Sequence, residues 1–252
     1  MIINNNMSIL NPYRFQTTTG SSVIDNHNWE VHYDATVGVY TTGTTDATNG
    51  QTIETWADQS GNGNDLLGAA APYRPTYDSS AFGGLGGIDL VSKHFTVTNS
   101  IDLNTGNPVW TAFHVIHRNG NSLWSLEAGS GLSGTGVLYG DGRAYATVAK
   151  SGRYFYRNYG GFTGDHIYVT QAATSGVDDG RVWFDGVSST PVTYLNAAKQ
   201  ACIYFGRRGS NTGPEASNGL YGEFLLTLSA LTEPEIEEIE TYLSEKWGLP
   251  IT

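Results

Sequence analysis

Short runs of apolar or alternating residues, separated by Gly, Asn, Asp and Pro, recur along the chain from residue 29 onward. Alternation with a period of two places every second side chain on one face of a strand, and this spacing of runs is typical of a β-sandwich. Residues 1–28 lack the pattern, so we expect an N-terminal arm that docks on a neighbour. Strands are predicted at residues 109–118, 122–127, 136–139, 144–149, 154–158, 166–172, 180–184, 202–206 and 222–228.

Two turns connect these predicted strands. Asp141-Gly142 and Asp185-Gly186 each lie between runs of strand-forming residues. Such dipeptides supply the positive φ angles that a tight hairpin requires, so both predict antiparallel pairing. Residues 41–50 are rich in Thr and Gly and are predicted to form an exposed loop.

One helix is predicted near the end of the chain, over residues 232–247. Thr232 and Glu235 have the spacing of a capping box, and Gly248 and Pro250 mark the end of the helix. Apolar residues at intervals of three and four form one stripe, which we expect to lie against the sandwich: Ile236, Ile239, Leu243 and Trp247. The fold class predicted is therefore all-β, a sandwich of two antiparallel sheets with one short C-terminal helix, in which residues 29–252 form one domain.

Composition narrows the classes of partner. The formal net charge is −11 with only 13 Lys and Arg residues, which disfavours nucleic acid and anionic membrane surfaces as partners. No apolar run reaches the roughly 18 residues that a membrane span needs. Cys202 is the only cysteine, so no intrachain disulfide is expected. The start lacks the pattern of a secretion signal, and both Met1 and Met7 are candidate start residues.

Several motifs are similar to those of a known family. The chain resembles the LamG-like, concanavalin A-like jelly-roll domains of bacterial surface proteins and bacteriophage structural proteins. The resemblance covers roughly residues 29–249 and rests on the opening motif at residues 56–65 (WADQSGNGND) with 74–77 (RPTY), the hairpin at 181–186 (RVWFDG), and the closing motifs at 221–226 (YGEFLL) and 242–249 (YLSEKWGL). It implies a jelly-roll sandwich and leaves function open, because one such fold supports many activities.

The resemblance also suggests an origin. Residues 11–15 (NPYRF) resemble the start of some phage structural proteins. This implies a non-enzymatic virion surface protein, a tail or capsid-decorating component, that is assembled in the host cytoplasm, binds host-surface glycans, and contacts other virion proteins through its arm. Alternatives are an extracellular bacterial protein, a purely architectural virion subunit, and a polysaccharide hydrolase or lyase. A homo-oligomer is compatible with each of them.

Aromatic and planar polar side chains mark two candidate glycan sites. Alternation in residues 153–159 places Tyr154 and Tyr156 on one face of a strand, where their rings could stack on a sugar. Arg207 and Arg208 precede a Gly-, Ser- and Asn-rich segment and form a second candidate site. Ordinary cross-strand packing of Tyr and Arg is the alternative interpretation of both sites.

A calcium site is suggested by the opening motif. Many domains of the resembled family bind calcium through Asp and Asn oxygens, and Asp58, Asn62, Asn64 and Asp65 offer such oxygens in one loop. The same residue types also form turns without any metal, and this alternative remains open.

No residue pattern indicates catalysis. The Glu-rich segment 235–240 has the capping and periodicity of a helix, so its carboxylates are expected to be solvated. Asp178 and Asp179 precede a Gly and are typical of a turn. His114 and His117 are three residues apart in a predicted strand, where they point to opposite faces and could not hold one metal ion together. The sequence therefore predicts no catalytic residue.

Overall fold

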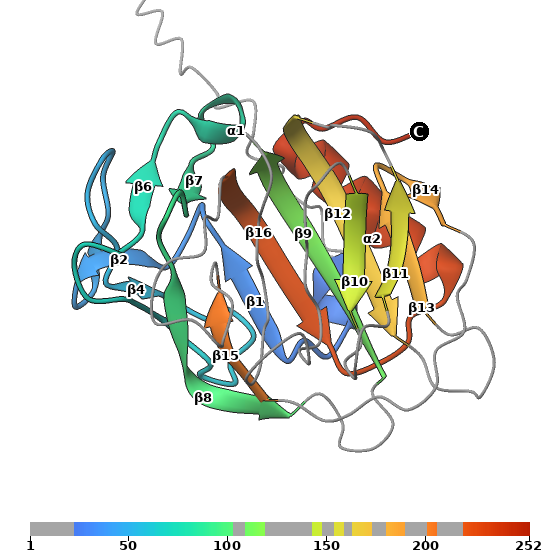
Figure 1. Ribbon diagram of the computed structural model, residues 1–252, viewed down its shortest axis with the longest axis horizontal. Helices are drawn as coiled ribbons and strands as arrows, with labels where there is room; N and C mark the ends of the chain where they lie inside the picture. Colours follow the sequence, from blue (N-terminus) through green and yellow to red (C-terminus); the bar gives the residue numbers. More distant parts are fainter. Residues whose placement is uncertain are drawn as a thin grey trace, which may run out of the picture.

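The computed structural model describes residues 23–102, 109–118, 143–147, 154–158, 163–172, 180–189, 201–205 and 219–252, shown as coloured ribbon in Figure 1. For residues 97–102, 118, 143–147, 154–158, 172 and 201–205 it describes the backbone alone. Within these ranges the chain is built from antiparallel strands, two short helical turns and one long helix.

The strands form two large sheets and one separate hairpin. The eight-stranded sheet contains β1 (Val31–Asp34), β6 (Thr76–Asp78), β7 (Gly87–Asp89), β9 (Trp110–Arg118), β12 (Gly164–Ala172), β13 (Gly180–Phe184), β14 (Val187–Ser188) and β16 (Gly219–Thr227). The six-stranded sheet contains β2 (Val39–Thr42), β3 (Thr45–Asp46), β4 (Thr55–Trp56), β5 (Leu66–Gly68), β8 (Phe95–Asp102) and β15 (Ala201–Phe205). β10 (Arg143–Thr147) and β11 (Tyr154–Asn158) pair with each other.

β16 is the central strand of the eight-stranded sheet. It pairs with β9 along one edge, while β7 and β1 share its other edge end to end. All nine residues of β16 are buried because both faces of the strand are covered. Gly222 lies at a β-bulge, where a Cβ atom would come within 3.0 Å of both the Trp247 ring and Val115, so only glycine fits there without displacement.

The long helix α2 (Glu233–Trp247) lies behind the eight-stranded sheet in Figure 1. Its start, its end and its buried stripe are those predicted. Glu235 Oε2 accepts hydrogen bonds from the Thr232 backbone N–H and hydroxyl at 2.7 Å each, and Gly248 has a φ of 66°. The residues of the predicted stripe are all buried: Ile236, Ile239, Leu243 and Trp247.

The core lies between the sheets and contains large aromatic side chains. The Tyr33 ring stacks on Phe224 at a centroid distance of 6.1 Å and contacts Trp56, which in turn contacts Phe95 of the six-stranded sheet. Because neighbouring side chains alternate along a strand, Glu223 points to the opposite face, toward α2. The predicted all-β sandwich of two antiparallel sheets with a C-terminal helix is confirmed.

Most of the predicted strands have counterparts in the structure. β9, β10, β11, β12, β13, β15 and β16 each lie within three residues of a predicted boundary. Asp185 and Gly186 join β13 to β14 with φ angles of 48° and 84°, as the hairpin prediction requires. The predicted strands at 122–127 and 136–139, together with the Asp141-Gly142 turn and Asp178 and Asp179, lie outside the described residues.

Three predictions from local patterns need correction or sharpening. Residues 41–46 are not all loop, because β2 and β3 pair there as a short, largely exposed hairpin. Residues 23–28, predicted as part of the arm, include the 3₁₀ helix η1 (Val23–Asn26), whose Ile24 is buried in the core. Glu240 was expected to be solvated, yet it is 1% exposed because its side of α2 faces the β13–β14 turn.

No helix among the described residues is both long and apolar enough to cross a membrane.

Candidate functional site

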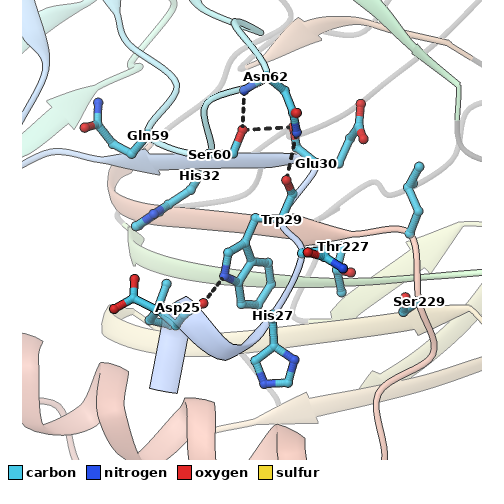
Figure 2. A pocket seen from close by; sticks show the side chains of 13 residues that line it. Asp25, His27, Trp29, Glu30, His32, Gln59, Ser60, Asn62, Thr227 and Ser229 are labelled. Carbon is cyan, nitrogen blue, oxygen red and sulfur yellow. Dashed lines mark hydrogen bonds between the residues drawn. The ribbon is translucent and has the colours of Figure 1, made fainter. Parts of the chain in front are cut away.

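A polar cleft of about 550 Å³ opens beside β1, on the side of the eight-stranded sheet that faces α2 (Figure 2). One wall comes from η1 and the segment leading into β1, a second from the loop after β4, and a third from the end of β16. The cleft is lined by Ile24, Asp25, His27, Asn28, Trp29, Glu30, His32, Gln59, Ser60, Asn62, Thr227, Leu228 and Ser229. Its lining thus offers carboxylates, imidazoles, amides and hydroxyls.

The wall formed by the loop after β4 is held against β1 by side-chain amides. Asn62 Nδ2 donates to the backbone carbonyls of Trp29 at 2.9 Å and Glu30 at 3.1 Å, and Asn64 Nδ2 donates to the same Glu30 carbonyl at 3.0 Å. The Ser60 hydroxyl also donates to this carbonyl. These bonds all engage the backbone carbonyl of Glu30, so they fix the backbone of this residue against the loop.

Asp58 anchors the same loop. Its Oδ1 accepts from the His32 N–H at 3.0 Å and the Ser60 N–H at 2.9 Å, and its Oδ2 accepts from the Ser60 hydroxyl at 2.7 Å and the Asn64 N–H at 3.0 Å. An ionised carboxylate has about four lone-pair sites, so protein donors alone satisfy Asp58. A calcium ion here would have to displace some of these donors. Asp65 Oδ1 likewise accepts from the Asp58 N–H at 2.8 Å.

The aromatic part of the cleft is packed against the core. Trp29 is buried, donates its indole N–H to the Ile24 carbonyl at 2.7 Å, and meets the Phe113 ring edge-on. The His27 ring lies 5.6 Å from the Trp29 ring. These contacts hold η1 and the segment leading into β1 against the sheet.

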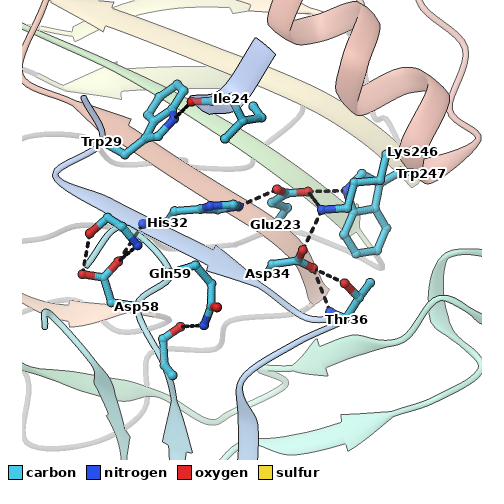
Figure 3. A network of polar contacts seen from close by, with 12 residues as sticks. Ile24, Trp29, His32, Asp34, Thr36, Asp58, Gln59, Glu223, Lys246 and Trp247 are labelled. Carbon is cyan, nitrogen blue, oxygen red and sulfur yellow. Dashed lines mark hydrogen bonds and ion pairs between the residues drawn. The ribbon is translucent and has the colours of Figure 1, made fainter. Parts of the chain in front are cut away.

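Behind the cleft lies a buried network of charged groups that begins at His32 (Figure 3). His32 Nε2 lies 2.7 Å from Glu223 Oε1, while Glu223 Oε2 accepts from Lys246 Nζ and from the Trp247 indole N–H, each at 2.6 Å. Lys246 Nζ also donates to Asp34 Oδ2 at 2.7 Å. The network therefore joins β1, β16 and the last turn of α2.

The electrostatics of the network keep Glu223 ionised. Complete burial by itself would raise the pKa of Glu223, but the Lys246 ammonium and the hydrogen bond from His32 outweigh burial and hold the pKa below its usual value. Burial would likewise lower the pKa of Lys246, yet Glu223 and Asp34 together raise it. Because an ionised carboxylate only accepts, the proton shared with Glu223 belongs to His32 Nε2.

His32, Asp34 and Glu223 also have the spacing of a metal site. One ligand atom from each lies within 4.8 Å of the other two, an arrangement that only this trio of His, Cys, Asp or Glu residues has in the described part of the chain. The Lys246 ammonium lies between the two carboxylates, however, and supplies the positive charge that they require. We therefore assign the network a role in positioning β1 and α2.

The predicted calcium ligands Asp58, Asn62, Asn64 and Asp65 lie in one loop, as described above. Calcium binding there is untested, and the four hydrogen bonds to Asp58 favour the alternative of a turn without metal. His114 and His117 lie on opposite faces of β9, as their spacing predicts. His114 is buried against the Phe224 ring at 4.9 Å, whereas His117 is half-buried with its Nδ1 2.6 Å from Asp165.

The structure describes only the backbone of Tyr154 and Tyr156, two of the predicted glycan-binding residues. Tyr154 and Tyr156 belong to β11, opposite Thr147 and Tyr145 of β10, and this hairpin lies beside β13. Their side chains lie outside the described part of the chain, as do Arg207 and Arg208 entirely. Both glycan sites stay predictions.

Sequence reasoning missed the cleft and the network. The opening and closing motifs did contain Gln59, Glu223 and Lys246, but as marks of a fold. The signal available was an acidic residue in a strand otherwise made of apolar residues, at Glu223, and a lysine beside a buried tryptophan, at Lys246. Their pairing joins segments that are 23 residues apart along the chain, and His32 is 191 residues from Glu223, so no local pattern reveals it.

Comparisons with known proteins support the fold. Neither a protein-family model nor a curated protein matches this sequence. Among solved structures, the ligand-binding domain of botulinum neurotoxin serotype D, in complex with N-acetylneuraminic acid, is 12% identical with a TM-score of 0.56 over 91% of this chain and 56% of that chain. Domain 4 of AbnA, an extracellular GH43 arabinanase from Geobacillus stearothermophilus in complex with arabinotriose, is 11% identical with a TM-score of 0.53 over 84% of this chain and 98% of that domain.

A third similar structure is Trypanosoma rangeli sialidase in complex with sialic acid. It is 14% identical with a TM-score of 0.53, and the match covers 90% of this chain but only 34% of the sialidase. This chain therefore spans about a third of the sialidase that it matches. At such low identities, these likenesses support a shared β-sandwich fold and nothing finer.

Proposed function

We propose that this chain is a non-enzymatic, lectin-like β-sandwich that binds a glycan in the cleft beside β1. The observation that carries the proposal is the lining of the cleft, in which amide, hydroxyl, imidazole and carboxylate groups from three segments converge. A sugar presents many hydroxyls that both donate and accept, so such a lining matches its chemistry. The neighbouring folds described above, whose structures contain bound sugars, support the same class of ligand.

The two carboxyl groups of the buried network, Glu223 and Asp34, do not suit turnover, and the assay for reducing ends below tests the two in the lining, Asp25 and Glu30. A glycosidase of the usual kind requires two carboxyl groups that flank a scissile bond, one of them able to give up a proton. Glu223 is fully buried, and its oxygens accept from His32, Lys246 and Trp247, so it has neither access to a substrate nor a proton to donate. Asp34 is bound by Lys246 and Thr36 in the same way.

For the biological setting, we propose a virion surface protein of the LamG-like kind, a tail or capsid-decorating component that attaches through its N-terminal arm. The motifs that resemble phage structural proteins support this setting. Electron microscopy of particles labelled with an antibody to this chain tests it: surface labelling is expected, and labelling of the bacterial envelope alone would contradict it.

A glycan array probed with the complete chain tests binding directly. We expect bound glycans, with affinity reduced about three- to tenfold by Gln59→Ala, since one hydrogen-bonding group is lost from the wall of the cleft. Asp46→Ala, an exposed change in β3 at the outer edge of the six-stranded sheet, is the matched control and should bind as the parent does.

Two other outcomes would replace the proposal. An array without any bound glycan, together with normal incorporation of the chain into particles, would favour a purely architectural subunit. Release of reducing ends from cell-wall or algal polysaccharide would instead identify a hydrolase, and formation of unsaturated sugar ends would identify a lyase.

A further inference from the structure

Resting on the proposed function, we infer that the cleft selects uncharged glycans and discriminates against glycans that end in sialic acid. The charges of the lining carry this inference. Asp25 and Glu30 are acidic, and none of the thirteen lining residues is Lys or Arg. A sialic acid carries a carboxylate, and its recognition calls for a cation or a set of donors directed at that group.

The network behind the cleft adds to this selectivity. Lys246, the lysine of the network, makes ion pairs with Glu223 at 2.6 Å and Asp34 at 2.7 Å, so two carboxyl groups face a single ammonium. His32 directs Nε2–H toward Glu223, and the same side chain lines the cleft. The side chain that joins the network to the cleft is therefore already committed to a carboxylate of the protein.

Other groups of the lining suit hydroxyl donors. Carboxylate oxygens of Asp25 and Glu30 accept hydrogen bonds from sugar hydroxyls, and such charge-assisted bonds are stronger than neutral ones. Gln59 and Ser229, both exposed at the cleft, supply groups that donate as well as accept. The same carboxylates repel an anionic sugar, which distinguishes this cleft from a site for sialic acid although two of the similar structures contain that sugar.

The test is an array of glycan pairs that differ only by a terminal sialic acid, with arabinotriose and cellotriose as further neutral probes. The complete chain is probed at pH 8 and low salt, where repulsion between the charges of the lining and a sialic acid is screened least. We expect each neutral member to bind about tenfold more tightly than its sialylated partner, with a smaller preference at 0.5 M salt because the repulsion is screened.

Asp25→Asn with Glu30→Gln removes both charges while keeping the shapes of the side chains. This double variant should bind sialylated and neutral members of a pair almost equally, whereas Asp46→Asn should keep the parental preference. Glu30→Gln alone is the second variant, with half the effect expected, should the double variant not fold.

The outcomes separate the two proposals. Equal or tighter binding of sialylated glycans by the parent chain overturns the charge selectivity and leaves glycan binding in place. Tighter binding of neutral glycans with a preference unchanged in both variants also overturns it, because the selectivity then arises elsewhere on the protein. An array without any binding overturns glycan binding itself, and the selectivity with it.

Discussion

Glu240 provides a quantitative test of the packing between α2 and the β13–β14 turn. Its Oε1 accepts from the Gly186 N–H at 3.2 Å, while its buried Oε2 has no hydrogen-bond partner among the described residues. Burial raises the pKa of Glu240 to about 7; the Gly186 hydrogen bond opposes this shift, and nearby Asp185 and Glu237 add to it. The folded protein thus keeps a proton on Glu240 that the unfolded chain loses near pH 4.5.

This difference makes stability depend on pH with a defined sign. The contribution of the protonated carboxyl is fully present below pH 4.5 and is lost as the pH rises through about 7. At about 1.4 kcal/mol for each pH unit between the two values, the loss amounts to roughly 3 kcal/mol. Glu240→Gln removes the charge and keeps the acceptor for Gly186. We expect the variant to match the parent at pH 4.5 and to exceed its free energy of unfolding by up to roughly 3 kcal/mol at pH 8.

Urea denaturation followed by tryptophan fluorescence, from pH 4.5 to 8.5, measures this difference. Glu238→Gln, an exposed glutamate on the same helix, is the control and should give a difference near zero across the range. A difference between Glu240→Gln and the parent that does not change with pH would refute the assignment. So would a variant that is less stable than the parent at pH 8.

Three further predictions concern other buried or hydrogen-bonded groups: Lys246, His114 and Asp58. Lys246→Met should lower the free energy of unfolding by about 3–5 kcal/mol in urea denaturation, because Glu223 and Asp34 are left buried without the lysine. Lys93→Met, at the more exposed pair with Asp89, is the control and should cost about 1 kcal/mol or less. Equal losses in the two variants would contradict the role of the network. Burial lowers the pKa of His114 to about 3, so the folded protein loses stability as the pH falls from about 6.5 toward 3. His114→Phe should reduce this loss in the free energy of unfolding by up to roughly 3 kcal/mol at pH 4. Equal losses in the variant and the parent would contradict the prediction. Because protein donors satisfy Asp58, millimolar calcium or a chelator should shift the melting temperature of the protein by less than about 1 °C. A clear rise of the melting temperature with calcium would instead establish the metal site.

Sequence reasoning located local elements well because their signals lie within a few residues. The Thr232 and Glu235 cap, the Gly248 end and the buried stripe of α2 all follow from spacings of three to four residues. The Asp185-Gly186 turn is local in the same sense. The same reasoning failed at Glu240, since helical periodicity shows which residues share a face but not which other elements reach around the edge of that face.

The amino-acid sequence by itself determined the class of fold, the C-terminal helix and its ends, and a loop rich in oxygen ligands. Tertiary structure decided what those residues do: Asn62 and Asn64 bind the Glu30 carbonyl, and Lys246 at the end of α2 meets Asp34, 212 residues earlier in the chain. The reason is physical. Capping, turns and alternation are set by bonds between near neighbours, whereas a buried charge is stable only where folding brings its partner, and the cleft exists only where three distant segments meet.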